Sequence, residues 1–139
     1  MTSPQRNWLL ASLAWIGLIF FSSTSAAGRL SERIYRVLFG DGSQSGAGFL
    51  HFIAEKSVHV TLFFVLGLLL IHMYDGSRPQ RFWKAAVTGL IIGSLSEYLQ
   101  SFFPDRDPAI RDVLINFVSA SIGAAIASVG RSDPSGTVK

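Results

Sequence analysis

Seven residues whose side chains can bind ligands or transfer protons lie near the ends of long apolar segments. They are Lys56, His59, Glu97, Gln100, Arg106, Asp112 and Asn116. Except for Arg106, which lies in a charged loop, each has a neighbour in the set three or four residues away, so each pair shares one face of a helix. An ionisable group inside a bilayer is costly and often marks a functional site. We therefore treat the set as a candidate ligand-binding site.

The charged members of this set suggest two kinds of chemistry. Glu97 and His59 are candidates for a general acid or base, although the sequence assigns neither a catalytic role. Lys56 and Arg106 suit a phosphate-bearing lipid, because Lys supplies a point charge and Arg a planar fork of donors. The structural alternative for both is that they extend to the membrane interface.

The acidic and amide members also have structural interpretations. Glu97 could order a helix bundle through a salt bridge to Lys56 or Arg111, and the functional role is slightly favoured. Asp112 alone is better explained as an acid at a helix N-terminus, where it complements the dipole. Asn116, one turn further along, is expected to form a hydrogen bond between helices.

Metal sites and serine nucleophiles are not expected. His59, Glu97 and Asp112 could together hold a metal ion, but no motif such as His-Glu-x-x-His accompanies them. The polar run Ser22–Ser25 lacks a Gly-x-Ser-x-Gly elbow, so we expect it to form hydrogen bonds within the protein. The chain has no cysteine, which excludes disulfides and thiolate metal sites. We predict neither a metal nor a cofactor.

The elements that position these residues are expected to be membrane-spanning helices. Apolar residues make up 49% of the 139-residue chain and charged residues only 15%, compared with about 25% in soluble proteins. The mean hydropathy is +0.39. The net charge of +3 does not indicate nucleic-acid binding, because the basic residues are scattered between apolar runs. The composition predicts a small integral membrane protein with one domain, 1–139.

Four segments are apolar enough to cross a bilayer, which takes roughly 20 residues of helix. They are 8–27, 57–74, 84–103 and 113–129. We predict an all-α protein, a compact bundle of four transmembrane helices. The end of the first segment imitates a secretory cleavage site, but we expect the segment to be retained.

A shorter helix is expected between the first two spans, over about residues 30–39. Arg29, Arg33 and Arg36 form one stripe, and Leu30, Ile34 and Val37 form the next. This spacing predicts an amphipathic helix in the headgroup layer of the membrane.

Alternation of the four spans places the seven candidates at one membrane face, in one shallow polar pocket with Arg106 near its mouth. Small residues, Gly89 with Gly93 and Ser119 with Gly123, allow the close helix approach that this requires. The glycine pair would serve a homodimer equally well. The twelve Lys and Arg residues divide six to six between the two faces. Three of them, Lys56, Arg106 and Arg111, lie among acids at helix ends. Without these three, six basic residues on the side of the termini compare with three on the other side, which favours cytoplasmic termini.

Three pieces of the sequence resemble the VanZ-like family of small bacterial membrane proteins. They are FSST from Phe21, EKSVH from Glu55, and SEYLQSFFPDRDPAIRDVLINFVSASIG from Ser96. The resemblance implies a location in the bacterial cytoplasmic (inner) membrane, and the founding member is associated with resistance to teicoplanin. The chain departs from the family pattern at two places. Pro104-Asp105-Arg106 stands where the family has a Pro-Gly-Arg turn, and Ser119 stands where the family has a glycine.

Two functions are consistent with these features. The first is a protein that binds or protects a lipid-linked component of the cell envelope or an amphiphilic glycopeptide-type drug. The alternative is a membrane hydrolase or transferase acting on a lipid phosphate, with Glu97 or His59 as the base and Arg106 as a phosphate clamp. The expected partners are the lipid bilayer and such a headgroup, with no nucleic acid.

Overall fold

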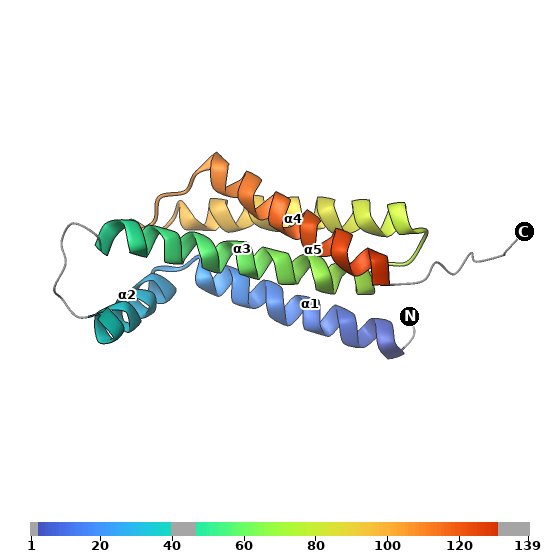
Figure 1. The fold of residues 1–139 in the computed structure, drawn as a ribbon, viewed down its shortest axis with the longest axis horizontal. Coiled ribbons are helices and arrows are strands. Elements are labelled where there is room, and N and C mark those ends of the chain that lie inside the picture. The colour runs from blue at the N-terminus through green and yellow to red at the C-terminus, as the bar shows by residue number, and fades with distance from the viewer. Residues whose placement is uncertain (1–2, 40–46, 131–139) are drawn as a thin grey trace, which may run out of the picture.

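The chain folds into α-helices throughout the part that its computed structural model describes, residues 3–39 and 47–130 (Figure 1). The five helices are α1 (Ser3–Ser22), α2 (Ser25–Phe39), α3 (Ala47–Met73), α4 (Arg78–Gln100) and α5 (Ile110–Gly130). Side chains of a few residues inside these helices, including Glu55, lie outside the described set. The all-α prediction is confirmed for the described residues.

Four long helices run along the length of the molecule, and α2 turns away from them at the end of α1 (Figure 1). α1, α3, α4 and α5 alternate in direction, so the C-terminal ends of α1 and α4 lie at the same end as the starts of α3 and α5. α3 is central, because it packs against α1, α4 and α5. We call the end of the molecule that carries α2 the polar end.

The first helix is shorter than predicted. The sequence predicts a span that reaches residue 27, but α1 ends at Ser22. α2 begins at Ser25, at an angle of 77° to α1. The hydroxyl groups of Ser22 and Ser23 both donate to the Ile19 carbonyl, and that of Thr24 donates to the Phe21 carbonyl. Such bonds compete with helix continuation. The amphipathic helix therefore starts five residues before the expected 30.

Two of the described helices are long and apolar enough to cross a membrane, α3 over Lys56–Met73 and α5 over Ile110–Gly130. A third span results if the bent pair α1 and α2 is counted as one. α4 does not meet this criterion, because its sequence is more polar.

The helices approach closely through small residues. A Cβ on Gly67 of α3 would overlap the Ala120 carbonyl of α5, and a Cβ on Gly123 would overlap the Phe64 carbonyl of α3. Gly89 and Gly93 of α4 lie against side chains of α5, since Cβ atoms built on them would be 2.7 Å from the Ala120 Cβ and 3.3 Å from the Asn116 Cβ. The predicted glycine pair is thus used within the chain, and Gly67 is a contact that the sequence analysis missed.

Large apolar side chains cover the outside of the bundle. Exposed apolar side chains on α4 and α5 include Val87, Ile91, Leu114, Val118, Ile122 and Ile126. The interior holds Phe63, Leu66 and Leu70 of α3, but also many small and polar side chains. An apolar exterior around a partly polar interior is the arrangement expected in lipid.

Candidate functional site

The break between α1 and α2 is held by the loop that joins α4 to α5. Arg106 Nη2 donates to the backbone carbonyls of Ser22, at 2.8 Å, and Thr24, at 3.1 Å. Asp105 accepts a hydrogen bond from the Ser25 hydroxyl at the start of α2. We call these contacts the Asp105–Arg106 clasp. It satisfies the Ser22 carbonyl at the end of α1 and gives the Thr24 carbonyl, which also accepts the Gly28 backbone N–H, a second donor just before α2 begins.

The clasp involves the position at which the sequence departs from the turn it resembles. An aspartate replaces the expected glycine, and its carboxylate finds Ser25 as a partner. This hydrogen bond is the main reason that the pKa of Asp105 lies below its ordinary value, with smaller contributions from Arg29 and Arg106.

A pocket of about 80 Å³ lies between the clasp, α2 and α3. Its lining consists of Ser22, Ala27, Gly28, Ser31, Val58, His59 and Arg106. His59 is buried, and Gly28 lies against the Arg106 guanidinium, where a Cβ would be 3.4 Å from Cζ. The pocket thus combines one guanidinium and one imidazole with small and apolar neighbours.

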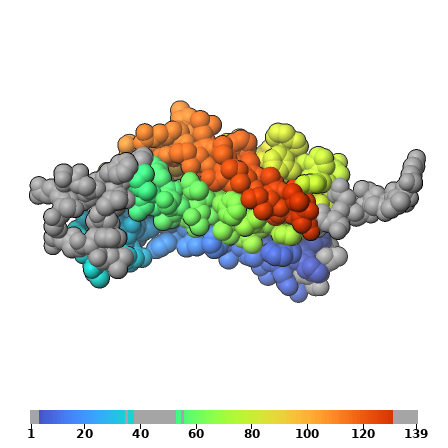
Figure 2. Space-filling view, viewed as in Figure 1, coloured from blue at the N-terminus to red at the C-terminus, as the bar shows by residue number. Residues whose placement is uncertain are grey.

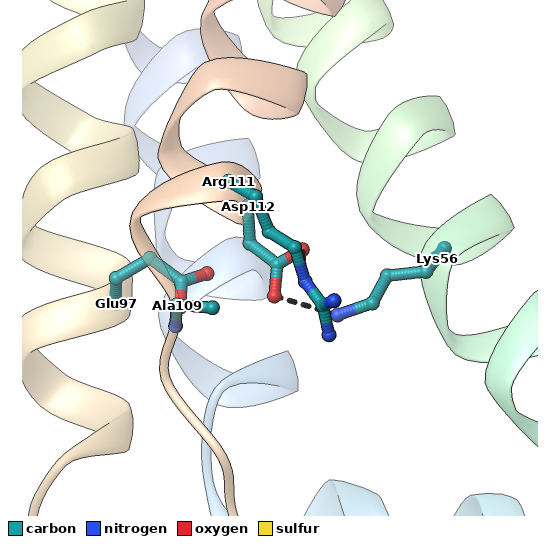
Figure 3. A network of polar contacts seen from close by, with 5 residues as sticks. All are labelled: Lys56, Glu97, Ala109, Arg111 and Asp112. Atoms are coloured by element: carbon teal, nitrogen blue, oxygen red, sulfur yellow. Dashed lines mark hydrogen bonds and ion pairs between the residues drawn. The ribbon is translucent and has the colours of Figure 1, made fainter.

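Lys56 of α3 and Asp112 of α5 form an ion pair at the same end of the molecule (Figure 3). Lys56 Nζ lies 2.6 Å from Asp112 Oδ2, and the Lys56 side chain is 22% exposed. Arg111 Nε is 3.9 Å from the other carboxylate oxygen, and its side chain extends into the open. Asp112 also lies in the first turn of α5, as its structural interpretation requires.

Glu97 is buried near the C-terminal end of α4 and faces the start of α5. Its Oε2 accepts a hydrogen bond of 3.2 Å from the backbone N–H of Ala109, the residue before α5 (Figure 3). A carboxylate at this position stabilises the helix N-terminus. The structural alternative for Glu97 was a salt bridge to Lys56 or Arg111, and the structure places the Lys56 ammonium against Asp112.

Asn116 is fully buried but forms no hydrogen bond to the described residues, which corrects the interhelical bond predicted for it. The amide nitrogen and oxygen both lack a partner there. The Asn116 Cβ lies 3.3 Å from the position that a Cβ on Gly93 would occupy, so Asn116 faces α4. Ser96 of α4 makes a polar contact with Ser23 in the break after α1, with 2.7 Å between their hydroxyl oxygens.

The seven predicted residues share the polar end but divide between separate places. His59 and Arg106 line the pocket, Lys56 and Asp112 form the ion pair, and the remaining three are buried along α4 and α5: Glu97, Gln100 and Asn116. No group of three or more His, Cys, Asp and Glu in the described residues is arranged to hold a metal ion.

The contribution of α2 to the site was not predicted from the sequence. Gly28 and Ser31 line the pocket, yet neither carries a charge, and only their position one turn apart on a helix could have indicated a common face. Arg81 was also missed: it is buried at the opposite end, where its Nη1 donates to the Gly76 carbonyl at 3.0 Å.

The fold and this polar end define a small all-α membrane protein whose charged residues gather where its long helices begin and end. The model of the VanZ/LLP1 family matches residues 8–131, so the chain belongs to this family, and the predicted resemblance is confirmed. No curated protein and no solved structure matches the chain.

Proposed function

We propose that this VanZ-like protein binds the anionic headgroup of an amphiphile, either a lipid-linked component of the cell envelope or an amphiphilic glycopeptide-type drug. The observation that carries the proposal is the pocket in which Arg106 and His59 lie beneath the amphipathic helix α2. An arginine fork suits a phosphate or carboxylate, and the apolar neighbours suit the adjoining chain.

The proposal places all four long helices across the bilayer. α4 packs along α3 and α5 and exposes Val87, Ile91 and Leu95 on its outer side, which supports a membrane-spanning role despite its polar inner side. In this arrangement α2 lies at the bilayer surface, because it is bent by 77° from α1. We place both termini in the cytoplasm of a bacterial cell and the polar end at the outer leaflet of its inner membrane.

Membrane orientation is tested with single cysteines, since the chain has none of its own. Asp107 and Ser77 are exposed at opposite ends of the bundle. A membrane-impermeant maleimide applied to intact cells should label Asp107→Cys and not Ser77→Cys, while both should react after lysis. Labelling of Ser77→Cys alone would place the pocket at the cytoplasmic face.

Ligand binding is tested by filling the pocket. Val58 lines it, and Val60 is two residues away on α3, outside the lining, with a similar exposure of 41% against 49%. Purified protein in phosphatidylcholine nanodiscs is titrated with teicoplanin and, separately, with phosphatidic acid. Val58→Trp should weaken the binding of one of these probes at least tenfold, and Val60→Trp should not. Equal effects of the two substitutions, or no binding of either probe, would refute the proposed pocket.

A second candidate function is a hydrolase or transferase acting on a lipid phosphate. It is favoured by one observation, that a possible base, His59, and a possible phosphate clamp, Arg106, line the same pocket. Release of inorganic phosphate from phosphatidic acid in nanodiscs, abolished in His59→Gln while binding persists, would establish phosphatase chemistry. Binding without turnover would favour the binding protein.

A further inference from the structure

A second surface on α2 has the features of a headgroup site. A shallow groove of about 260 Å³ is lined by Ala26, Arg29, Leu30 and Arg33. The two arginines are exposed and one helical turn apart, so their guanidinium groups can reach the same bound group.

These two arginines differ from the third one on the helix. Arg36 is held in an ion pair with Glu32 one turn before it. Neither Arg29 nor Arg33 forms a hydrogen bond or ion pair among the described residues. Asp105, which is bonded to Ser25, acts on Arg29 only through longer-range electrostatics. The groove therefore has two positive groups whose donors are available to a ligand.

The groove lies on a different side of α2 from the pocket. Ala26, Arg29, Leu30 and Arg33 follow the spacing of one helix face, and the pocket uses Ala27, Gly28 and Ser31. Leu30 and Ile34, each 51% exposed, form the apolar stripe beside the arginines. In Figure 2, α2 lies at one end of the molecule, beyond the end of α1.

We propose that Arg29 and Arg33 bind the phosphate of an anionic phospholipid, with Leu30 against the start of its acyl chains. Two guanidinium forks four residues apart suit the phosphate oxygens, and an exposed apolar stripe beside them suits a lipid and not a soluble anion. The ligand is a component of the surrounding leaflet. The site relies on the membrane placement of α2 described above, but not on occupancy of the pocket.

The site is tested with the full chain reconstituted in phosphatidylcholine bilayers that contain trace spin-labelled phosphatidylglycerol or spin-labelled phosphatidylcholine. Electron paramagnetic resonance measures the fraction of each label immobilised by the protein. The wild type should prefer phosphatidylglycerol. Arg29→Gln and Arg33→Gln should each lower this preference about fivefold. The double variant Arg29→Lys/Arg33→Lys keeps both charges and should show a smaller loss. Circular dichroism establishes that the variants remain helical.

Two controls make the test specific. Arg78→Gln/Lys84→Gln removes two exposed charges at the opposite end and should leave the preference unchanged. If it lowers the preference as much, net charge alone explains the effect and the proposed site is wrong. Val58→Trp, which fills the pocket, should also leave it unchanged; a loss there with none in Arg29→Gln/Arg33→Gln would move the headgroup to the pocket. Displacement of the lipid by millimolar inorganic phosphate would show that the groove takes free phosphate, against our proposal.

Discussion

The crossing of α3 and α5 depends on two glycines, and replacing either with alanine should destabilise the protein. A Cβ at Gly67 would overlap the Ala120 carbonyl and lie 2.8 Å from the Ala124 nitrogen. A Cβ at Gly123 would overlap the Phe64 carbonyl and lie 3.2 Å from the Leu68 nitrogen. The obstacles are backbone atoms of the facing helix, so no side chain can rotate away to make room.

The size of the effect follows from this geometry. An ordinary Cβ contact is 3.4–4 Å, so α3 and α5 must separate by more than an ångström at the overlapped carbonyl to accept either methyl group. Overpacking of this kind costs about 1–3 kcal/mol, and the rigid obstacles place Gly67→Ala and Gly123→Ala at the upper end. Because the two sites share one helix crossing, the double variant should lose less than the sum of the two.

Gly17→Ala is the matched control, because nothing lies within 4 Å of a Cβ built on this glycine of α1. Alanine there should leave the free energy of unfolding unchanged or raise it by up to about 1 kcal/mol through helix propensity. The measurement is reversible unfolding in mixed micelles, followed by circular dichroism. If Gly67→Ala and Gly123→Ala unfold like the control, the helices do not cross at these glycines, and the positions assigned to the polar residues on α3 and α5 are also wrong.

Three further predictions concern the polar end. Removing one partner of the ion pair, in Lys56→Gln or Asp112→Asn, should lower the free energy of unfolding by about 2 kcal/mol or more. This is below the range for a fully buried pair because the Lys56 side chain is 22% exposed, and a double-mutant cycle should show strong coupling between the two residues. Asn116→Leu should raise the free energy of unfolding by about 1 kcal/mol or more, because it removes a buried amide without hydrogen bonds; a loss of stability would reveal a bound water or ligand. Because the pKa of Asp105 is lowered in the folded protein, its carboxylate stabilises the fold above pH 3.8 and stops doing so as the pH falls through the lowered pKa. The difference in Tm between the wild type and Ser25→Ala should therefore shrink on acidification.

The polar end could be predicted from the sequence because membrane helices restrict where charges can lie. Glu97 and Asp112 sit near the end and the start of two successive apolar segments, so they had to meet at one membrane face if both segments span. Spacing also placed Lys56 on the part of α3 that reaches this face. The pairing of Lys56 with Asp112 and not Glu97 depends on how α3 and α5 rotate about their axes, which hydropathy does not determine.

The break after Ser22 could not be predicted, because its cause lies far away in the sequence. Composition remains compatible with a helix through Ala26 and Ala27, and hydroxyl groups alone do not stop a helix. The carbonyls of Ser22 and Thr24 are instead taken by Arg106, 84 and 82 residues later. A contact of this range leaves no local periodicity to detect.

Arg106 has two roles in this arrangement, and they affect how the pocket is tested. The same guanidinium that lines the pocket holds the carbonyls of Ser22 and Thr24, so it also sets the direction of α2. Replacing Arg106 would remove a donor from each of these carbonyls, leaving that of Thr24 with only the Gly28 N–H. It would therefore release the direction of α2, the helix that contributes Ser31 to the pocket lining. Loss of binding in such a variant would therefore be expected whether or not Arg106 touches the ligand. Val58→Trp changes the volume of the pocket and leaves the Asp105–Arg106 clasp in place, which is why it, and not a substitution of the arginine, decides whether the pocket binds an anionic headgroup.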